Sequence, residues 1–373
     1  MKKAHVKTRR RLPVREFFKV TDLILFCLAS NFVFASQPDH RIAQAAQSDP
    51  SILSEADKAQ LLEFNRLKKE WGNRVWPGFE ETFIPVLLFN RTWEFLVGHA
   101  DPPETWSRVA QDEFQGFPYY RRQAQQPQAF TARIGTLWAS SLNTLEDMNQ
   151  SMEELLRERS AEEGLTAAMR KMFQISPGYH VTALLHEAFH AFQAMRTPER
   201  FRRAEEAYVG EKIYPYKDPE FKKTWNKEGE LLAAALLEKE ESVCRDIVVS
   251  FLEVRRQRRE VARLPDRLAD FEKDLEWLEG LGKYAEMRFA ELAASGSEED
   301  KAKDYRIVSN RSRYDLFFRL NKLGELTGDH RFYLSGVVQA FLLDRFLPGW
   351  KDRLMDDQLL SLEDLLAQAL EKS

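Results

Sequence analysis

The sequence predicts an α+β protein that is predominantly helical, with a small mixed sheet followed by a large helical region. Two observations predict this class. Between residues 76 and 143, proline and glycine separate short apolar runs, as is typical of strands and turns. From residue 144 onward, apolar residues recur at helical spacing over long segments. Because 43% of the 373 residues are hydrophobic and 12% are aromatic, the chain can build a substantial core.

Residues 1–35 have the pattern of a secretory signal peptide. A basic stretch is followed by an apolar run of about 13 residues, which ends in Val33-Phe34-Ala35, a small-residue cleavage site. The run is shorter than the ~20 residues that cross a bilayer as a helix. We therefore predict export to the periplasm or the extracellular space, with cleavage after Ala35. The alternative is an uncleaved membrane anchor that holds the remaining chain outside the cytoplasm.

The charge that remains after cleavage limits the partners. Residues 1–35 hold 8 of the 55 basic and 2 of the 59 acidic residues, so the mature chain has a net charge of −10. This charge argues against nucleic acid as a partner. Cys244 is then the only cysteine, so no intramolecular disulfide can form and a metal site would use histidine and carboxylate ligands. Contact with a membrane is expected only if the N-terminal segment is retained.

The mature chain divides into three segments by composition. Residues 36–52 are polar and rich in Gln, Ser and Pro, which predicts a flexible leader. Residues 53–150 form an N-terminal α+β part. Residues 151–373 form the helical part.

The N-terminal part opens with a helix and continues with strands. Ser54-Glu55-Ala56-Asp57 is typical of a helix start, and apolar residues follow it at helical spacing. The apolar run 83–89 indicates a strand. Over residues 130–138 apolar and other residues alternate with period two, which predicts one strand with a face on the core.

Long helices dominate the remainder. The main helical candidates are residues 144–175, 181–196, 228–263, 266–295 and 329–346, with breaks at Pro177, Pro198, Pro265 and Gly296.

One of these helices carries the motif that indicates chemistry, His186-Glu187-Ala188-Phe189-His190. Two histidines four residues apart lie on one helical face about one turn apart, which suits two imidazoles on one zinc ion. Glu187 stands next to the first histidine and can accept a proton from a water whose pKa the metal lowers. The surrounding apolar residues place this motif in a partly buried helix, as a preorganised site requires.

Two other metal classes do not fit the sequence. A di-iron bundle needs a second Glu-x-x-His pair, and the chain has none besides Glu187-x-x-His190. The long metzincin motif needs a third histidine six residues after His190, where Arg196 stands. The third ligand is therefore expected elsewhere, as a glutamate.

Four glutamates are candidates for the third ligand: Glu211, Glu228, Glu241 and Glu279. Glu279 is favoured because Gly280 follows it, and glycine allows another backbone to approach closely beside the carboxylate. The alternative interpretation of this segment is an ordinary amphipathic helix.

At this point the chain resembles the gluzincins, particularly the peptidase MA-like group, whose third ligand lies in a segment of the form W-L-x-E-G-L-A-x-Y. Residues 279–284 match the E-G-L-A-x-Y part of this form, with Glu279 at the ligand position and Tyr284 at the aromatic position, whereas Trp277-Leu278 stand one position closer to the glutamate than the form has them. Gly282 stands where the pattern usually has alanine. The resemblance implies a zincin-like fold, in which the helical part is the catalytic part. Glu279 follows His190 by 89 positions, which indicates an inserted helical pair between them.

The resemblance extends to Tyr333-Leu334-Ser335-Gly336, similar to a Y-x-x-G helix found downstream of the ligand in these peptidases. It implies that Tyr333 donates a hydrogen bond to the oxyanion, although a tyrosine that anchors a core helix is an equal alternative. His180 and His330 are further candidate neighbours of the site. Zincin peptidases commonly bind substrate along a sheet edge, for which we expect residues 131–140.

These features predict an exported zinc metallopeptidase with His186, His190 and Glu279 as zinc ligands and Glu187 as general base. Its substrate would be a peptide or a protein, with endopeptidase and aminopeptidase activity both open. The first alternative is a non-catalytic binding protein with a zincin fold. The second is a zinc hydrolase that acts on a non-peptide amide or on cell-wall material.

Overall fold

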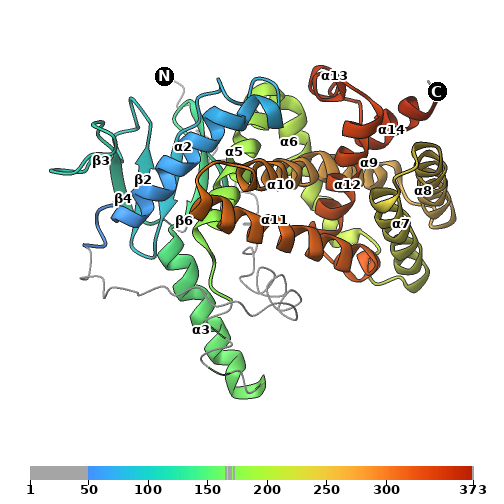
Figure 1. Cartoon of the computed structure of the whole chain (residues 1–373), viewed down its shortest axis with the longest axis horizontal. Coiled ribbons are helices and arrows are strands. Elements are labelled where there is room, and N and C mark those ends of the chain that lie inside the picture. The colour runs from blue at the N-terminus through green and yellow to red at the C-terminus, as the bar shows by residue number, and fades with distance from the viewer. Residues whose placement is uncertain (1–48, 126, 164–165, 167–169, 171–172, 372–373) are drawn as a thin grey trace, which may run out of the picture.

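A computed structural model confirms the mixed α+β class, with a small sheet at one end of the molecule and a large helical region beside it (Figure 1). The structure describes residues 49–371, except 126, 164, 165, 167–169, 171 and 172. The predicted signal peptide and most of the predicted flexible leader therefore lie outside the described residues.

The first described helix, α2 (Glu55–Val75), begins where the sequence predicted it. Ser54 is the N-cap, and its side chain accepts a hydrogen bond from the backbone N–H of Asp57. The Asp57 carboxylate in turn accepts from the backbone N–H of Ser54, which completes a capping box. This reciprocal pair satisfies two backbone donors that a helix N-terminus otherwise leaves unpaired.

The sheet has six strands in the order β3-β4-β2-β1-β6-β5. β1 and β6 are parallel and the other pairs are antiparallel, so the sheet is mixed as predicted. β5 is the outer strand at the end of the sheet that contacts the helical region. The strands are β1 (Val86–Phe89), β2 (Trp93–Val97), β3 (Ser107–Arg108), β4 (Tyr120–Gln123), β5 (Phe130–Ile134) and β6 (Leu137–Asn143).

The single strand predicted over residues 130–138 is wrong. The chain reverses at Gly135, whose φ of 60° is left-handed, and Ile134 pairs with Leu137 across a two-residue turn. The period-two alternation continued through so short a turn and concealed it. Only residues 131–134 of the predicted substrate edge therefore lie in the outer strand, because β6 is enclosed between β1 and β5.

The helical region begins at Leu145. Its helices are α3 (Leu145–Glu163), α5 (Pro177–Arg196), α6 (Pro198–Ala207), α7 (Pro219–Leu237), α8 (Glu241–Val261), α9 (Asp266–Leu275), α10 (Leu281–Ala294), α11 (Glu299–Leu320), α12 (His330–Phe346), α13 (Trp350–Asp356) and α14 (Leu362–Glu371). The described part of this region also contains two short 3₁₀ helices, η1 (Tyr208–Ile213) and η3 (Leu323–Glu325), and a π-helical turn, η2 (Glu276–Gly280). No helix in the described part of the chain is both long and apolar enough to span a membrane.

Two predicted helix boundaries are wrong for identifiable reasons. Pro177 does not break a helix but begins α5, with Ser176 as the N-cap, because proline suits the first turn. The predicted helix 228–263 is two helices, α7 and α8, separated at residues 238–240. Proline likewise begins α7, at Pro219, nine residues before the predicted start.

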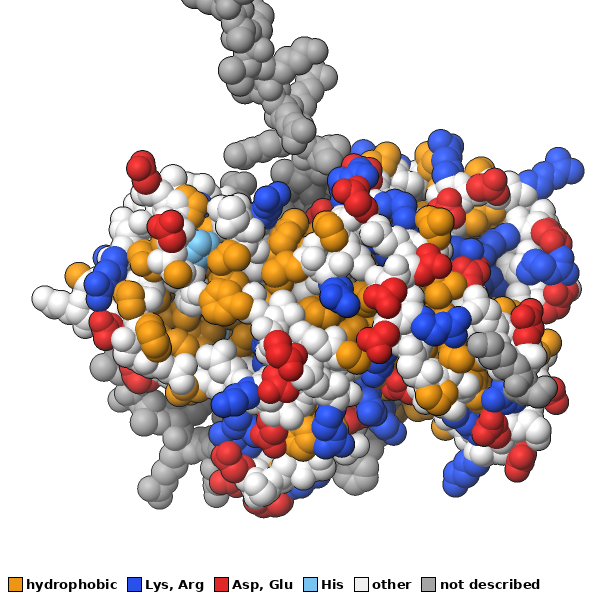
Figure 2. Space-filling model, turned by 90° about the horizontal axis from the view of Figure 1, so that it is seen from above, with side chains coloured by type: hydrophobic (Ala, Val, Ile, Leu, Met, Phe, Trp, Pro, Cys, Tyr) orange, Lys and Arg blue, Asp and Glu red, His pale blue; other side chains and the backbone are white. Residues whose placement is uncertain are grey.

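One apolar core joins the predicted α+β and helical parts. Its buried residues extend from Leu53 to Ala369. Within it, the Trp76 ring packs edge-on against Phe189 of α5 at a centroid distance of 5.2 Å and against Trp350 at 5.2 Å. Seen from above, hydrophobic side chains gather on the surface toward the sheet end, whereas basic and acidic side chains mix at the helical end (Figure 2).

A buried charge cluster ties the helices around η2 together. It consists of Arg255, Arg258 and Arg259 of α8 with Glu228 of α7, Glu272 of α9, Glu276 of η2 and Glu363 of α14. Arg255 alone contacts three of the carboxylates at N–O distances between 2.7 and 3.0 Å. Buried ions require such pairing because they have lost their hydration.

Replacing Glu363 by glutamine is expected to lower the free energy of unfolding at pH 7 by about 3 kcal/mol, because it removes one of the carboxylates that compensate the buried arginine charge. Burial alone would raise the pKa of Glu363, but Arg259 and Arg255 lower it to about 2. Its stabilisation is therefore present above the ordinary pKa and is lost as the pH falls toward 2. Urea unfolding at several pH values should show the difference from wild type shrinking below about pH 5.

The matched control is Glu260→Gln, which removes an exposed carboxylate paired with Arg256 on the same helix. This change should alter the free energy of unfolding by less than about 0.5 kcal/mol. Equal effects of the two substitutions would contradict the role given to the buried cluster.

Candidate metal centre

Helix α5 presents the two histidines of the motif side by side. Both His186 and His190 are buried, and their Nε2 atoms lie 3.1 Å apart. Their spacing of four residues places them on one face, one helical turn from each other. Glu187, between them in sequence, is also buried.

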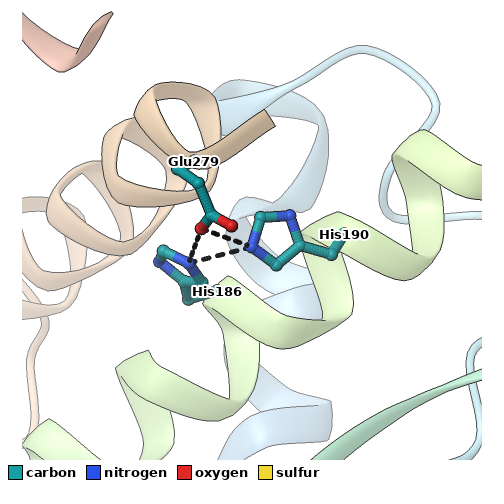
Figure 3. A group of neighbouring side chains, drawn as sticks. All are labelled: His186, His190 and Glu279. Atoms are coloured by element: carbon teal, nitrogen blue, oxygen red, sulfur yellow. Dashed lines mark hydrogen bonds and ion pairs between the residues drawn. The ribbon is translucent and has the colours of Figure 1, made fainter. Parts of the chain in front are cut away.

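Glu279 meets this pair from the π-helical turn η2 (Figure 3). Its Oε2 atom lies 3.3 Å from Nε2 of His190 and 3.9 Å from Nε2 of His186. Gly280, the next residue, has its Cα so near α12 that an added Cβ would stand 2.6 Å from Cα of Gly336. The close backbone approach expected beside Glu279 is therefore present, and π-helical turns of this kind often occur at functional sites.

His186, His190 and Glu279 form a buried group that could hold a metal ion. Ligands at about 2.0–2.1 Å from a tetrahedral zinc ion are about 3.3 Å from one another. The three distances between the donor atoms, 3.1, 3.3 and 3.9 Å, bracket that value. The donor set and its spacing thus fit a single small cation.

The other nitrogen of each histidine has its own partner. Nδ1 of His186 lies 3.2 Å from Oε2 of Glu286 on α10, and Nδ1 of His190 lies 2.9 Å from Oε1 of Gln193. The Gln193 amide in turn donates to the backbone carbonyl of Trp277 at 2.8 Å. Such contacts fix the rings so that both Nε2 atoms face Glu279.

Sequence reasoning missed both of these supporting residues. Gln193 follows His190 by three positions, so helical spacing alone could have indicated it. Glu286 follows Glu279 by seven positions, two helical turns, which could have indicated it once Glu279 was chosen.

The electrostatics of the group favour a positive charge. Burial alone would lower the pKa of His186, but hydrogen bonds with Glu279 and Glu286 raise it to about 10. The carboxylates around the ring thus stabilise a cation at this position. A metal ion would supply the same compensating charge.

The three rival glutamates lie elsewhere. Glu211 is exposed on η1. Glu228 is buried between Arg255 and Arg258 in the charge cluster, and Glu241 is exposed at the start of α8, where it accepts from Arg245. None of them belongs to the candidate metal group.

Tyr333 of α12 lies directly beside the group. Its ring stacks on that of His186 with a centroid distance of 5.7 Å and an interplanar angle of 14°. Its hydroxyl is buried and has no hydrogen-bond partner within the described residues, and burial raises its pKa well above the usual value. The contact with His186 places Tyr333 next to the candidate metal group, and its role stays a prediction.

The two extra histidines differ in position. The ring of His330, at the start of α12, lies 6.2 Å from that of Tyr333, at the margin of the site. His180 contacts the backbone carbonyl of Asn143 at 2.8 Å, and burial lowers its pKa to about 4. It is a neutral structural residue that ties α5 to the end of β6.

The outer strand β5 borders the metal group through Phe130, whose ring centroid lies 5.0 Å from that of His190. The same ring stacks on Phe201 of α6 at 6.2 Å. The edge of the sheet and the histidine helix are therefore adjacent. Phe130 stands one residue before the predicted substrate edge, and substrate binding along that edge stays a prediction.

Gly282 leaves no room for a side chain. An added Cβ would stand 2.8 Å from Nε2 of His186 and 2.9 Å from Cε1 of His190. The alanine usual in the resembling pattern would therefore push against both imidazoles in this chain.

Replacing Gly282 by alanine is expected to weaken zinc affinity about 10–100-fold, as for other changes that misplace metal-bound histidines. Competition with a chelator of known affinity measures this. Gly210→Ala is the control, because its Cβ would only touch Leu268 and Phe271 at 3.4 Å. Wild-type affinity in the Gly282 variant would contradict the close approach.

No family model, curated protein or solved structure matches this chain.

Proposed function

We propose that this chain is a zinc-dependent peptidase with a zincin-like, gluzincin-type catalytic part. The observation that carries the proposal is the buried group of His186, His190 and Glu279, with Glu187 next to the first histidine. Two histidines and one glutamate are a ligand set of catalytic zinc sites, and three protein ligands leave a fourth position open. A zinc ion bound there would polarise a scissile carbonyl and lower the pKa of the attacking water.

Within this proposal, Glu187 is the general base. It accepts a proton as water attacks the peptide carbonyl and later delivers that proton to the amine as the C–N bond breaks. Tyr333 donates its hydroxyl hydrogen to the oxygen that gains negative charge during the attack. The absence of a competing partner for that hydroxyl within the described residues supports this role.

The substrate backbone would pair with the outer strand β5. This strand ends the sheet and contacts α5, and Phe130 touches His190. A peptide added as a further strand there would run beside the zinc ligands. The N-terminal signal pattern supports action outside the cytoplasm.

The test uses purified protein, a mixed peptide library and mass spectrometry. About one zinc ion per chain is expected, with cleavage that stops after chelation and returns with zinc. Internal cleavage would identify an endopeptidase, and stepwise shortening from the amino end an aminopeptidase. Stoichiometric zinc without turnover would instead support a binding protein or a hydrolase of other amides, and cleavage that persists without metal would contradict the proposal.

A further inference from the structure

We propose that Tyr208 is a positioning residue that keeps Glu279 bound to the metal through one carboxylate oxygen. This inference rests on the proposed metal ligation. Tyr208 opens the 3₁₀ helix η1 and lies 71 residues before Glu279 in the chain.

The two oxygens of Glu279 have different neighbours. Oε2 faces Nε2 of both histidines, whereas Oε1 accepts a hydrogen bond from the Tyr208 hydroxyl at 2.5 Å. One oxygen is therefore directed to the candidate metal position and the other to a phenol donor. Hydrogen bonds to a carboxylate are among the stronger ones in proteins.

The Tyr208 hydroxyl is itself held in place from a second side. It lies 3.2 Å from Oδ2 of Asp329, the residue before α12. A few residues along, the Tyr216 hydroxyl donates to the backbone carbonyl of Gly328 at 2.8 Å. The segment that carries Tyr208 is thus fastened to the loop that precedes Tyr333 and α12.

The hydrogen bond from Tyr208 affects the coordination number of the bound metal ion. If both oxygens of Glu279 bound a zinc ion together with two imidazoles, the protein would supply four donors, and a bound water would raise the coordination number from four to five. Rotation of the carboxylate so that both oxygens bind the metal would break the hydrogen bond from the Tyr208 hydroxyl to Oε1. Tyr208 therefore favours three donors and keeps a position open for water or substrate, which a catalytic site needs.

The experiment compares Tyr208→Phe with the matched control Tyr216→Phe. Each change removes one hydroxyl from the same segment facing the same loop, but only Tyr208 contacts Glu279. Cobalt(II) replaces zinc in the full-length protein, because its visible absorption weakens when coordination number rises above four. Zinc affinity and the kcat and KM of any peptide turnover are measured on the zinc forms.

For Tyr208→Phe we expect weaker cobalt absorption than for wild type. We also expect a kcat about 10-fold lower with little change in KM, because residues that orient metal ligands typically contribute at least about 10-fold. Tyr216→Phe should match wild type in both. Unchanged cobalt absorption in Tyr208→Phe would overturn the inference. If wild type binds metal without cleaving peptides, the proposed function fails while the cobalt comparison still decides the role of Tyr208; if it binds no metal, both fail.

Discussion

Replacing Glu187 by glutamine will lower peptide hydrolysis by about 10²–10⁴-fold while zinc content stays at the wild-type level. Glutamine keeps the shape of the side chain but cannot take a proton from water. Because Glu187 is not one of the three grouped donors, its loss leaves the metal ligands in place. Zinc content by atomic absorption and kcat on the best library peptide measure the two effects separately.

The matched control for this change is Glu199→Gln, which alters an exposed carboxylate on α6 that pairs with Arg202. It should leave both zinc content and kcat unchanged. Wild-type turnover in the Glu187 variant would show that Glu187 is not the general base. Loss of zinc together with activity would show instead that Glu187 supports the metal site.

Helical spacing alone predicted the part of the site that is held within one helix. Helical periodicity alone stacks His186 and His190, and the structure places their Nε2 atoms 3.1 Å apart. Glu279, 89 residues later, was predicted from the glycine beside it and from the family resemblance. Tyr208 could not be found in this way, because a 3₁₀ turn between two helices carries no periodic signal.

The errors in the fold have equally local causes. Proline was interpreted as a break at Pro177, where it is instead the first residue of α5. The separation of α7 from α8 at residues 238–240 contains neither proline nor glycine, so nothing in the sequence marked it. Helix α11 was missed because it has little apolar periodicity and exposes Ile307 and Tyr314.

The long interval between His190 and Glu279 also acquires a physical explanation. Helices α7 and α8 lie within it, and Arg255 of α8 bonds Glu276, which is three residues before Glu279 in the same π-helical turn. Ser335 of α12 donates to the same Glu276 carboxylate. Helix α8 therefore supports the turn that presents the third donor.

Replacing Glu279 by alanine will weaken zinc affinity by more than about 100-fold, the upper range for residues that only support a metal ligand. Alanine removes one of three donors, and the two histidines that remain cannot close the site. Chelator competition on the purified variant measures the affinity. Circular dichroism should show an unchanged helical content, because the core around η2 retains Trp277 and Leu278, both fully buried.

The controls for this change are the sequence rivals Glu211→Ala and Glu241→Ala, both exposed and outside the donor group. Each should keep wild-type zinc affinity. If Glu279→Ala retained zinc with unchanged affinity, the third ligand would have to be another residue. Among the described residues that would direct attention to Glu187 and Glu286, the other buried carboxylates beside His186, because Glu286 already lies 3.2 Å from its Nδ1 atom.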